Sequence, residues 1–315
     1  MSDILNDSWV ERFRPDSLAS MVLPAPYRTA FEKYVESGNM SNVILYSSSA
    51  GTGKTSLAKA IVSDLDVEYL FINASIKTGV DIVRDQVTNF AQYDALNGKP
   101  KVVILDEFDG SSPQMQKALK SFIEEYHESC RFIVTTNSIV DIVPQLISRC
   151  KVFDFNFSHN RHKDEMIQLV AKRVRSILDV VKVPYEKESL LTLVLEGFPD
   201  IRGVLNACSL AYDMYGGINS ESVSVTAYDS DLLDNIIHGK ITAISNAMET
   251  NSDYRGVYTF IYRNLDKYLD MGVSVQVIPI ISDYMWRESR GVIDSNLNFM
   301  SMCIQIRNVI TKNGQ

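Results

Sequence analysis

Short apolar runs alternate with amphipathic stretches through the first half of the chain. The apolar runs are VILYS, EYLFIN, KVVILDEFD, RFIVTTN and KVFDFN, all between residues 43 and 156. Stretches with helical spacing separate them, in GKTSLAKAIVSDL, at residues 80–93, in PQMQKALKSFIEEYHE and at residues 142–147. Strands that alternate with helices indicate a parallel sheet, because each parallel pair needs a crossover connection. We therefore expect an α/β domain over residues 1–157, with a parallel five-stranded sheet and flanking helices.

Strand patterns stop after this domain, and two helical regions follow. Apolar residues recur every three or four positions at Met166, Val170, Val174 and Ile177. This spacing predicts an amphipathic helix, and further helices are expected near Lys187 and Arg202. We expect residues 158–227 to form a small helical lid.

The last part of the chain follows a turn-rich stretch in which Gly216 and Gly217 mark the best candidate for a linker. Beyond it, one helical face carries Val257, Phe260, Ile261, Leu265, Tyr268 and Leu269. We expect residues 228–315 to form a third, all-helical domain.

Composition narrows the class of protein. A chain of 315 residues with 45% hydrophobic content can bury a substantial core. No apolar run reaches the roughly 18 residues that a membrane span needs. The opening MSDILNDSWVERFRP has no basic stretch before an apolar core, which argues against a signal peptide. These features predict a soluble protein of the cytoplasm.

Cysteine spacing and charge exclude further classes. Cys130, Cys150, Cys208 and Cys303 include no CxxC pair, which argues against a zinc module or a disulfide framework. The formal net charge of −8 works against non-specific attraction to nucleic acid. Any contact with DNA therefore needs a local basic face.

The segment SSAGTGKT, residues 48–55, follows an apolar strand and opens a helix. This is the context of a loop whose backbone N–H groups cradle phosphate at the positive end of a helix. Lys54 can reach the β and γ phosphate oxygens, and the Thr55 hydroxyl can bind magnesium. The predicted cradle comprises Gly51, Thr52, Gly53, Lys54, Thr55 and Ser56. Ser48 stands where the usual pattern has its first glycine, so we expect a slightly altered entry turn that still permits binding.

Acidic and amide side chains follow two of the predicted strands. Asp106 ends KVVILD and is expected to hold magnesium, and Glu107 beside it is expected to act as the general base on the attacking water. Asn137 ends RFIVTTN, which we expect beside the acidic pair, where its amide could orient that water. A solvated turn after each strand is the alternative interpretation.

Two arginines are candidates for stabilising charge on the transferred phosphoryl group. Arg149, in ISRC, is expected on the domain surface, from where it could enter a neighbouring subunit's site. Arg202, in FPDIRGVLN, is expected to approach the γ-phosphate of its own chain when the lid closes. Solvated or helix-face ion pairs are the alternatives for both.

Taken in order, WVERFRPDSL, GTGKT, FINAS, DEFD, TTN, SRC and PDIRGVLN resemble the sequence boxes of sliding-clamp loader ATPase subunits of the AAA+ family. This order spans roughly residues 9 to 206. The chain resembles the large subunit of T-even-type bacteriophage clamp loaders and is similar to replication factor C small subunits. If the resemblance holds for a phage protein, the compartment is the host cell cytoplasm.

The resemblance implies a P-loop ATPase domain, a lid, and a helical collar through which subunits assemble. It implies a five-membered spiral that contains other copies of this chain and a second kind of loader subunit. ATP and Mg²⁺ are the implied cofactors. The implied activity is ATP hydrolysis coupled to a sliding clamp and primer-template DNA: ATP binding opens the clamp and grips DNA, and hydrolysis releases the loader.

The resemblance also assigns further candidate residues. Family members seat adenine against the N-terminal box, which corresponds here to Val10, Glu11, Arg12, Phe13 and nearby Val22. The helix after FINAS lines the DNA-facing interior in this family, which makes Lys77 and Arg84 candidates for phosphate contacts. Solvated surface charges are the alternative interpretation for both. Lys77 could also hold Glu107 away from water when DNA is absent.

Two other functions remain open at this point. The chain could be another AAA+ DNA-associated motor, such as a helicase loader or a branch-migration ATPase. It could also be a scaffold in which bound nucleotide is only structural, although the retention of Lys54, Thr55, Asp106 and Glu107 argues against that. Stimulation of hydrolysis by clamp and primed DNA together would distinguish a loader from both.

Overall fold

The computed structural model describes residues 8–74, 80–93, 95, 98–224, 230–248 and 254–314. The chain forms two compact units, residues 1–223 and 224–315. The expected α/β domain lies within the first unit together with most of the expected lid. The division between the units falls after Val223, beyond the expected linker glycines.

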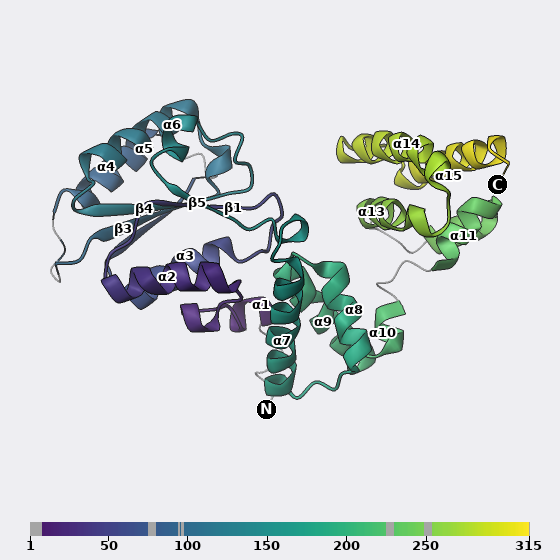
Figure 1. Cartoon of the computed structure of the whole chain (residues 1–315), viewed down its shortest axis with the longest axis horizontal. Helices are drawn as coiled ribbons and strands as arrows, with labels where there is room; N and C mark the ends of the chain where they lie inside the picture. The colour runs from purple at the N-terminus through teal and green to yellow at the C-terminus, as the bar shows by residue number, and fades with distance from the viewer. Residues whose placement is uncertain are drawn as a thin grey trace. The chain divides into compact units, whose positions relative to one another are not determined.

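A parallel five-stranded sheet forms the centre of the first unit, as the apolar runs predict (Figure 1). Its strands are β1 (Val43–Tyr46), β2 (Tyr69–Asn73), β3 (Lys101–Asp106), β4 (Cys130–Thr136) and β5 (Lys151–Asp154). The spatial order is β2-β3-β4-β1-β5. The three central strands are almost wholly buried, because helices cover both faces, whereas the edge strands β2 and β5 expose side chains.

Strand register brings the predicted site residues to one edge of the sheet. Asn73 pairs with Asp106, and Tyr46 pairs with Thr136. The carboxyl ends of β2, β3, β4 and β1 therefore meet, which is where ligands bind in open parallel sheets.

Helices cover both faces of this sheet. Figure 1 shows α2 and α3 on one face and α4, α5 and α6 on the other. Their bounds, with those of α1, are α1 (Trp9–Arg12), α2 (Ala25–Ser37), α3 (Lys54–Leu65), α4 (Val80–Ala91), α5 (Pro113–Glu125) and α6 (Pro144–Ile147). Short 3-10 segments lie at Leu18–Ser20, Phe108–Gly110 and Phe157–His159. The face under α4 and α5 buries Val83, Val103, Leu119 and Phe132 in one apolar cluster.

Four further helices follow the sheet: α7 (Lys163–Val181), α8 (Lys187–Gly197), α9 (Ile201–Tyr215) and α10 (Ser220–Ser224). The four apolar residues used to predict the first of these, from Met166 to Ile177, are all buried. Trp9 of α1 lies on α9, with its ring 6.1 Å from that of Tyr212. The N-terminal box therefore contacts the lid, and phosphate loop and lid belong to one compact unit.

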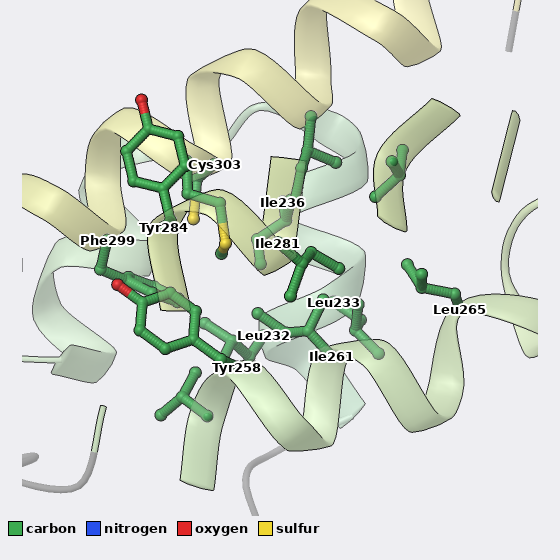
Figure 2. Close-up of a cluster of buried hydrophobic side chains, with 14 of the residues drawn as sticks. Leu232, Leu233, Ile236, Tyr258, Ile261, Leu265, Ile281, Tyr284, Phe299 and Cys303 are labelled. Atoms are coloured by element: carbon green, nitrogen blue, oxygen red, sulfur yellow. The ribbon is translucent and has the colours of Figure 1, made fainter. Parts of the chain in front are cut away.

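The second unit is all-helical, as expected from its apolar spacing. Its elements are α11 (Ser230–His238), α12 (Ile241–Met248), α13 (Tyr254–Asn264), a 3-10 turn (Leu265–Lys267), α14 (Met271–Ser289) and α15 (Ser295–Lys312). Figure 2 shows its core, where Tyr258 and Phe299 lie together with ring centroids 5.7 Å apart. The buried Tyr258 hydroxyl accepts a hydrogen bond from Asn298 Nδ2 at 3.0 Å, so this polar atom is satisfied inside the core.

All four cysteines are free thiols. Burial raises the pKa of Cys130 to about 12 and that of Cys150 to about 11. Across the described ranges, no helix is both long enough and apolar enough to cross a bilayer.

Candidate nucleotide-binding and hydrolysis site

The phosphate loop joins β1 to the first turn of α3. Gly51 and Gly53 both have left-handed backbone, with φ of +70° and +92°, and Gly53 caps the helix that begins at Lys54. Glycine adopts this conformation without the strain that a Cβ adds. The Thr52 hydroxyl oxygen is buried and has no hydrogen-bond partner. A buried hydroxyl without a hydrogen-bond partner at a helix N-terminus is consistent with a loop that binds an anion.

Ser48 occupies the position where the usual pattern has its first glycine, and its backbone does not need one. Among the described residues, left-handed backbone outside glycine occurs only at Asp66, Glu107 and Lys182. Ser48 donates from its N–H and its hydroxyl to Asn156 Oδ1, at 2.8 and 2.7 Å. The serine thus ties the loop entry to the chain beyond β5.

Lys54 is buried at the centre of this loop, with 8% of its surface exposed. Its ammonium donates to Asn137 Oδ1 at 2.9 Å and to the carbonyls of Ser49 and Ser47 at 3.1 and 3.4 Å. Burial lowers the pKa of Lys54 to about 8, although the carboxylates of Asp109 and Asp106 oppose this shift. The desolvated ammonium is well placed to exchange neutral oxygens for phosphate.

Asp106 lies at the end of buried β3 and accepts two short hydrogen bonds. Thr55 Oγ1 donates to Asp106 Oδ1 at 2.7 Å, and Thr135 Oγ1 donates to the same oxygen at 2.6 Å. A hydroxyl and a carboxylate oxygen in contact at a phosphate loop are hard ligands of the kind that Mg²⁺ takes beside substrate phosphates and water. The residues therefore fit a magnesium site of this type.

Glu107 follows in left-handed backbone, with φ of +56°. Its N–H donates to Thr135 Oγ1 at 3.0 Å, and its carboxylate accepts from Asn73 Nδ2 at 3.4 Å. A non-glycine residue in this conformation persists only where its surroundings hold it, and such residues gather at functional sites. The turn aims the carboxylate into the pocket that the phosphate loop lines.

The predicted amide on the neighbouring strand also reaches the pocket. Asn137 donates its backbone N–H to Asp109 Oδ1 at 2.9 Å, while its side chain accepts from Lys54. Lys54, Glu107 and Asn137 thus line one pocket. Sequence reasoning passed over Asn73 and Thr135. The signal for each was only a polar side chain, at the end of edge strand β2 for Asn73 and near the end of buried β4 for Thr135.

The same pocket extends between the N-terminal box and the lid helices. It is lined in the N-terminal part by Val10, Phe13, Arg14, Pro15, Met21 and Val22, in the loop by Ala50, Gly51, Thr52, Gly53, Lys54, Thr55 and Ser56, and in the lid by Arg173, Ile177, Ile201, Arg202 and Leu205. Of the predicted adenine contacts, three are in this lining. Glu11 and Arg12 are exposed and outside it.

The N-terminus of α9 lies directly on the phosphate loop. Ile201 N–H donates to the carbonyl of Gly51 at 3.1 Å, and the Asp200 carboxylate caps α9 by accepting from Gly203 N–H at 2.9 Å. A Cβ on Gly51 would lie 1.6 Å from Asp200 Oδ1. Arg202, the residue after Ile201, lines the same pocket, and its contact with a γ-phosphate stays a prediction.

Arg149 lies outside this pocket. It precedes β5, whose first residue Lys151 pairs with Val43 at the start of β1, whereas the phosphate loop follows Tyr46 at the other end. The length of β1, on the order of 10 Å, therefore separates Arg149 from the loop along the sheet. Arg149 instead lines an open surface hollow with Lys33, Tyr34, Ser37, Asn39, Met40, Ser41, Asn42, His127 and Arg131.

The two candidate DNA contacts differ in what can be said of them. Lys77, with its suggested contact to Glu107, lies outside the described residues. Arg84 lies on α4 with 56% of its side chain exposed, and its Nη1 is 3.8 Å from Asp81 Oδ1. Arg84 is thus a surface cation that does not line the nucleotide pocket.

The sheet domain matches a known family of ATPases. Residues 44–158 match the family model of the ATPase family associated with various cellular activities (AAA). Solved structures of the RuvB Holliday junction branch migration motor of Thermotoga maritima share the fold, with a TM-score of 0.56 at 17% identity over 76% of this chain and 87% of that one.

Curated relatives narrow the family. The chain is 32% identical over 229 residues to the sliding-clamp-loader large subunit of Escherichia phage RB69, covering 72% of this chain and 71% of that protein. The corresponding protein of Enterobacteria phage T4 is 31% identical with the same coverage. A replication factor C small subunit of Methanoculleus marisnigri is 28% identical over 90% of this chain and 91% of that protein. The chain therefore belongs to the sliding-clamp-loader family of AAA ATPases.

Proposed function

We propose that this chain is an ATPase subunit of a DNA sliding-clamp loader and that a neighbouring subunit completes its hydrolysis site. The proposal rests on one observation: the residues that could act in ATP hydrolysis lie at two opposite ends of the sheet. The groups for phosphate and water share one pocket, and Arg149 is at the opposite end of β1. The two phage relatives named as sliding-clamp-loader large subunits support this assignment.

The phosphate loop binds the triphosphate of ATP in the proposed cycle. Backbone N–H groups at the start of α3 and the Lys54 ammonium neutralise its β and γ oxygens. Thr55 and Asp106 hold magnesium, which when bound adds charge stabilisation at the phosphates. Val10, Phe13 and Val22 provide an apolar surface for the base, since all three line the same pocket.

Glu107 accepts a proton from the attacking water, and Asn137 orients that water. Arg202 contacts the γ-phosphate from the lid, whose helix α9 contacts Gly51. Loss of the γ-phosphate removes the partner of Arg202, so the lid changes its position on the loop. Hydrolysis is thereby coupled to movement of the lid.

Arg149 acts on the ATP of the neighbouring subunit. The hollow that it lines has cationic side chains from Lys33 and Arg131 as well, and none of its lining residues is acidic. Such a surface suits the phosphates that a neighbour presents. A guanidinium brought in trans stabilises charge on the transferring phosphoryl group and makes hydrolysis depend on assembly.

Assembly supplies the remaining partners in this proposal. Copies of this chain and a second loader subunit form a five-membered spiral through the helical second unit, and the spiral engages a sliding clamp and primer-template DNA. Lys77 and Arg84 contact DNA phosphates in the spiral interior. ATP binding gives the spiral the shape that opens the clamp, and hydrolysis releases the clamp on DNA.

The test is steady-state ATP hydrolysis by the assembled complex with clamp, with primed DNA, and with both. A clamp loader gives a rate with both partners that exceeds the sum of the separate effects. A branch-migration motor or helicase loader gives stimulation by DNA that the clamp does not change. A structural nucleotide site gives no turnover under any of these conditions.

A further inference from the structure

Arg149 is held on two sides by its own chain. Its Nε and Nη2 donate to Glu124 Oε1 at 3.0 and 2.6 Å, and its Nη1 donates to the carbonyl of Gln145 at 2.7 Å. Glu124 is near the end of α5, and Gln145 is one helical turn before the arginine. Two segments of the chain therefore meet at one guanidinium.

The stereochemistry of these bonds determines which edge of the guanidinium remains available. The group is planar and carries five N–H bonds in a fixed fork. A single oxygen, Glu124 Oε1, is bonded by Nε and Nη2 along the side edge, and the Gln145 carbonyl, four residues back in the chain, accepts one N–H of Nη1. Nη1 and Nη2 each carry a second N–H, and the further contact that the hydrogen bonds of the described residues include for them is a 3.5 Å approach of Nη1 to Ser148 Oγ, so N–H bonds remain for another partner.

The terminal edge, formed by Nη1 and Nη2, is the edge that a phosphate needs. Two parallel N–H bonds from Nη1 and Nη2 match a pair of phosphate oxygens. Arg149 lines the basic hollow beside Lys33 and Arg131, whereas Glu124 is not part of that lining. The carboxylate thus contacts the arginine from beside the hollow and does not compete for its open face.

We infer that Glu124 is a positioning residue for hydrolysis in trans: its carboxylate fixes the Arg149 guanidinium with the terminal edge directed at the neighbouring subunit's phosphate. This inference rests on the proposed trans role of Arg149. A mobile arginine side chain loses much rotamer freedom when it is ordered, and a fixed carboxylate partner removes part of that loss before the neighbour arrives. The carboxylate therefore acts on turnover and not on ATP affinity.

The experiment is a double-mutant cycle on the assembled complex, with kcat and KM for ATP measured in the presence of clamp and primed DNA. Glu124→Ala should lower kcat about fivefold with KM unchanged, as expected for loss of a partly exposed, orienting ion pair. Glu124→Gln, which keeps an acceptor oxygen, should retain an intermediate kcat. In an Arg149→Ala background, Glu124→Ala should have no further effect, because its target is gone.

Glu125→Ala is the matched control, since it removes the same charge from the next and last position of α5, one residue further from the Arg149 contact. It should leave kcat unchanged, and melting temperatures should show that all variants remain folded. A kcat that is unchanged or increased in Glu124→Ala overturns the inference, as do losses that add in the double variant. If Arg149→Ala itself leaves kcat unchanged, the trans role and this inference both fall. If Arg149→Ala lowers kcat and Glu124→Ala does not, the role of Glu124 alone falls.

Discussion

The Lys54 ammonium donates a 2.9 Å hydrogen bond to Asn137 Oδ1 across the mouth of the phosphate loop. These residues come from the start of α3 and the end of β4, which the parallel register brings to the same edge. Without phosphate, the cation thus has an amide oxygen and two carbonyls as its partners. In the proposed cycle, incoming γ-phosphate would replace these neutral oxygens and release Asn137 to orient water.

ATP affinity should therefore fall as pH rises above about 8. Burial lowers the pKa of Lys54 to about 8 in the free protein, so the ammonium that phosphate requires is progressively lost above this pH. Binding then needs proton uptake, and Kd should increase by up to about tenfold per pH unit. Calorimetric titration in two buffers of different ionisation enthalpy measures both Kd and the protons taken up.

Lys54→Arg provides the control for this pH dependence, because guanidinium remains charged throughout the range. Its affinity for ATP can be weaker than that of the parent, but its Kd should not vary with pH. A parent Kd that stays constant from pH 7 to pH 9.5, without proton uptake, would show that another group governs phosphate binding.

Glu107→Gln should preserve ATP binding and assembly while lowering turnover by roughly a hundredfold or more, because an amide cannot accept the proton of the attacking water. The isosteric side chain keeps the left-handed turn at this position and can retain the contact with Asn73. Rapid-quench measurement of hydrolysis, beside equilibrium binding of ATP, separates the two effects. Comparable losses in affinity and turnover would assign Glu107 to binding instead.

Arg149→Ala should abolish most hydrolysis in the assembled complex and should be rescued by mixing with Glu107→Gln chains. A mixed assembly contains sites in which an intact Glu107 meets an intact Arg149 from its neighbour, although each variant alone lacks one of them. The rate of the mixture should exceed the average of the two separate rates. If Arg149 served its own pocket, mixing would give no more than that average.

The strand pattern located the edge of the sheet at which the candidate site residues meet, because buried parallel strands leave few alternatives for register and direction. Asp106 ends buried β3, and Glu107 and Asn137 directly follow β3 and β4, so their convergence could be predicted from the strand pattern. Asn73 pairs directly with Asp106 and belongs to the same edge. A single polar residue at the end of an exposed edge strand, however, has the pattern of an ordinary strand terminus.

The N-terminal box shows what the linear pattern could not resolve. Val10 and Phe13 are three positions apart around α1, so both face the pocket, whereas Glu11 and Arg12 between them are exposed. The family resemblance identified residues 10–13 as a whole, but only the helical geometry shows that Val10 and Phe13 line the pocket and that Glu11 and Arg12 do not. The sequence did not indicate that Arg173 and Leu205 of the lid line the pocket. Helical periodicity shows which face of a helix is buried, but it does not show which part of the protein covers that face.

Gly51→Ala should weaken ATP binding at least tenfold by forcing the lid off the phosphate loop. The added Cβ would lie 1.6 Å from Asp200 Oδ1 and 2.5 Å from its Cγ, so the carboxylate must move and α9 loses its cap at Gly203. The alanine must also adopt φ of +70°, a strain of about 1–2 kcal/mol. Arg202 is two residues beyond the displaced carboxylate and should withdraw with it.

Gly38→Ala separates backbone strain from the clash with the lid. Gly38 has a similar φ of +65°, and a Cβ there meets nothing within 4 Å, so this variant should lose comparable stability and keep its ATP affinity. Asp200→Ala added to Gly51→Ala should recover part of the lost affinity, because it removes the two atoms in closest conflict. Equal ATP affinities for Gly51→Ala and Gly38→Ala would mean that the contact between lid and loop contributes nothing to nucleotide binding.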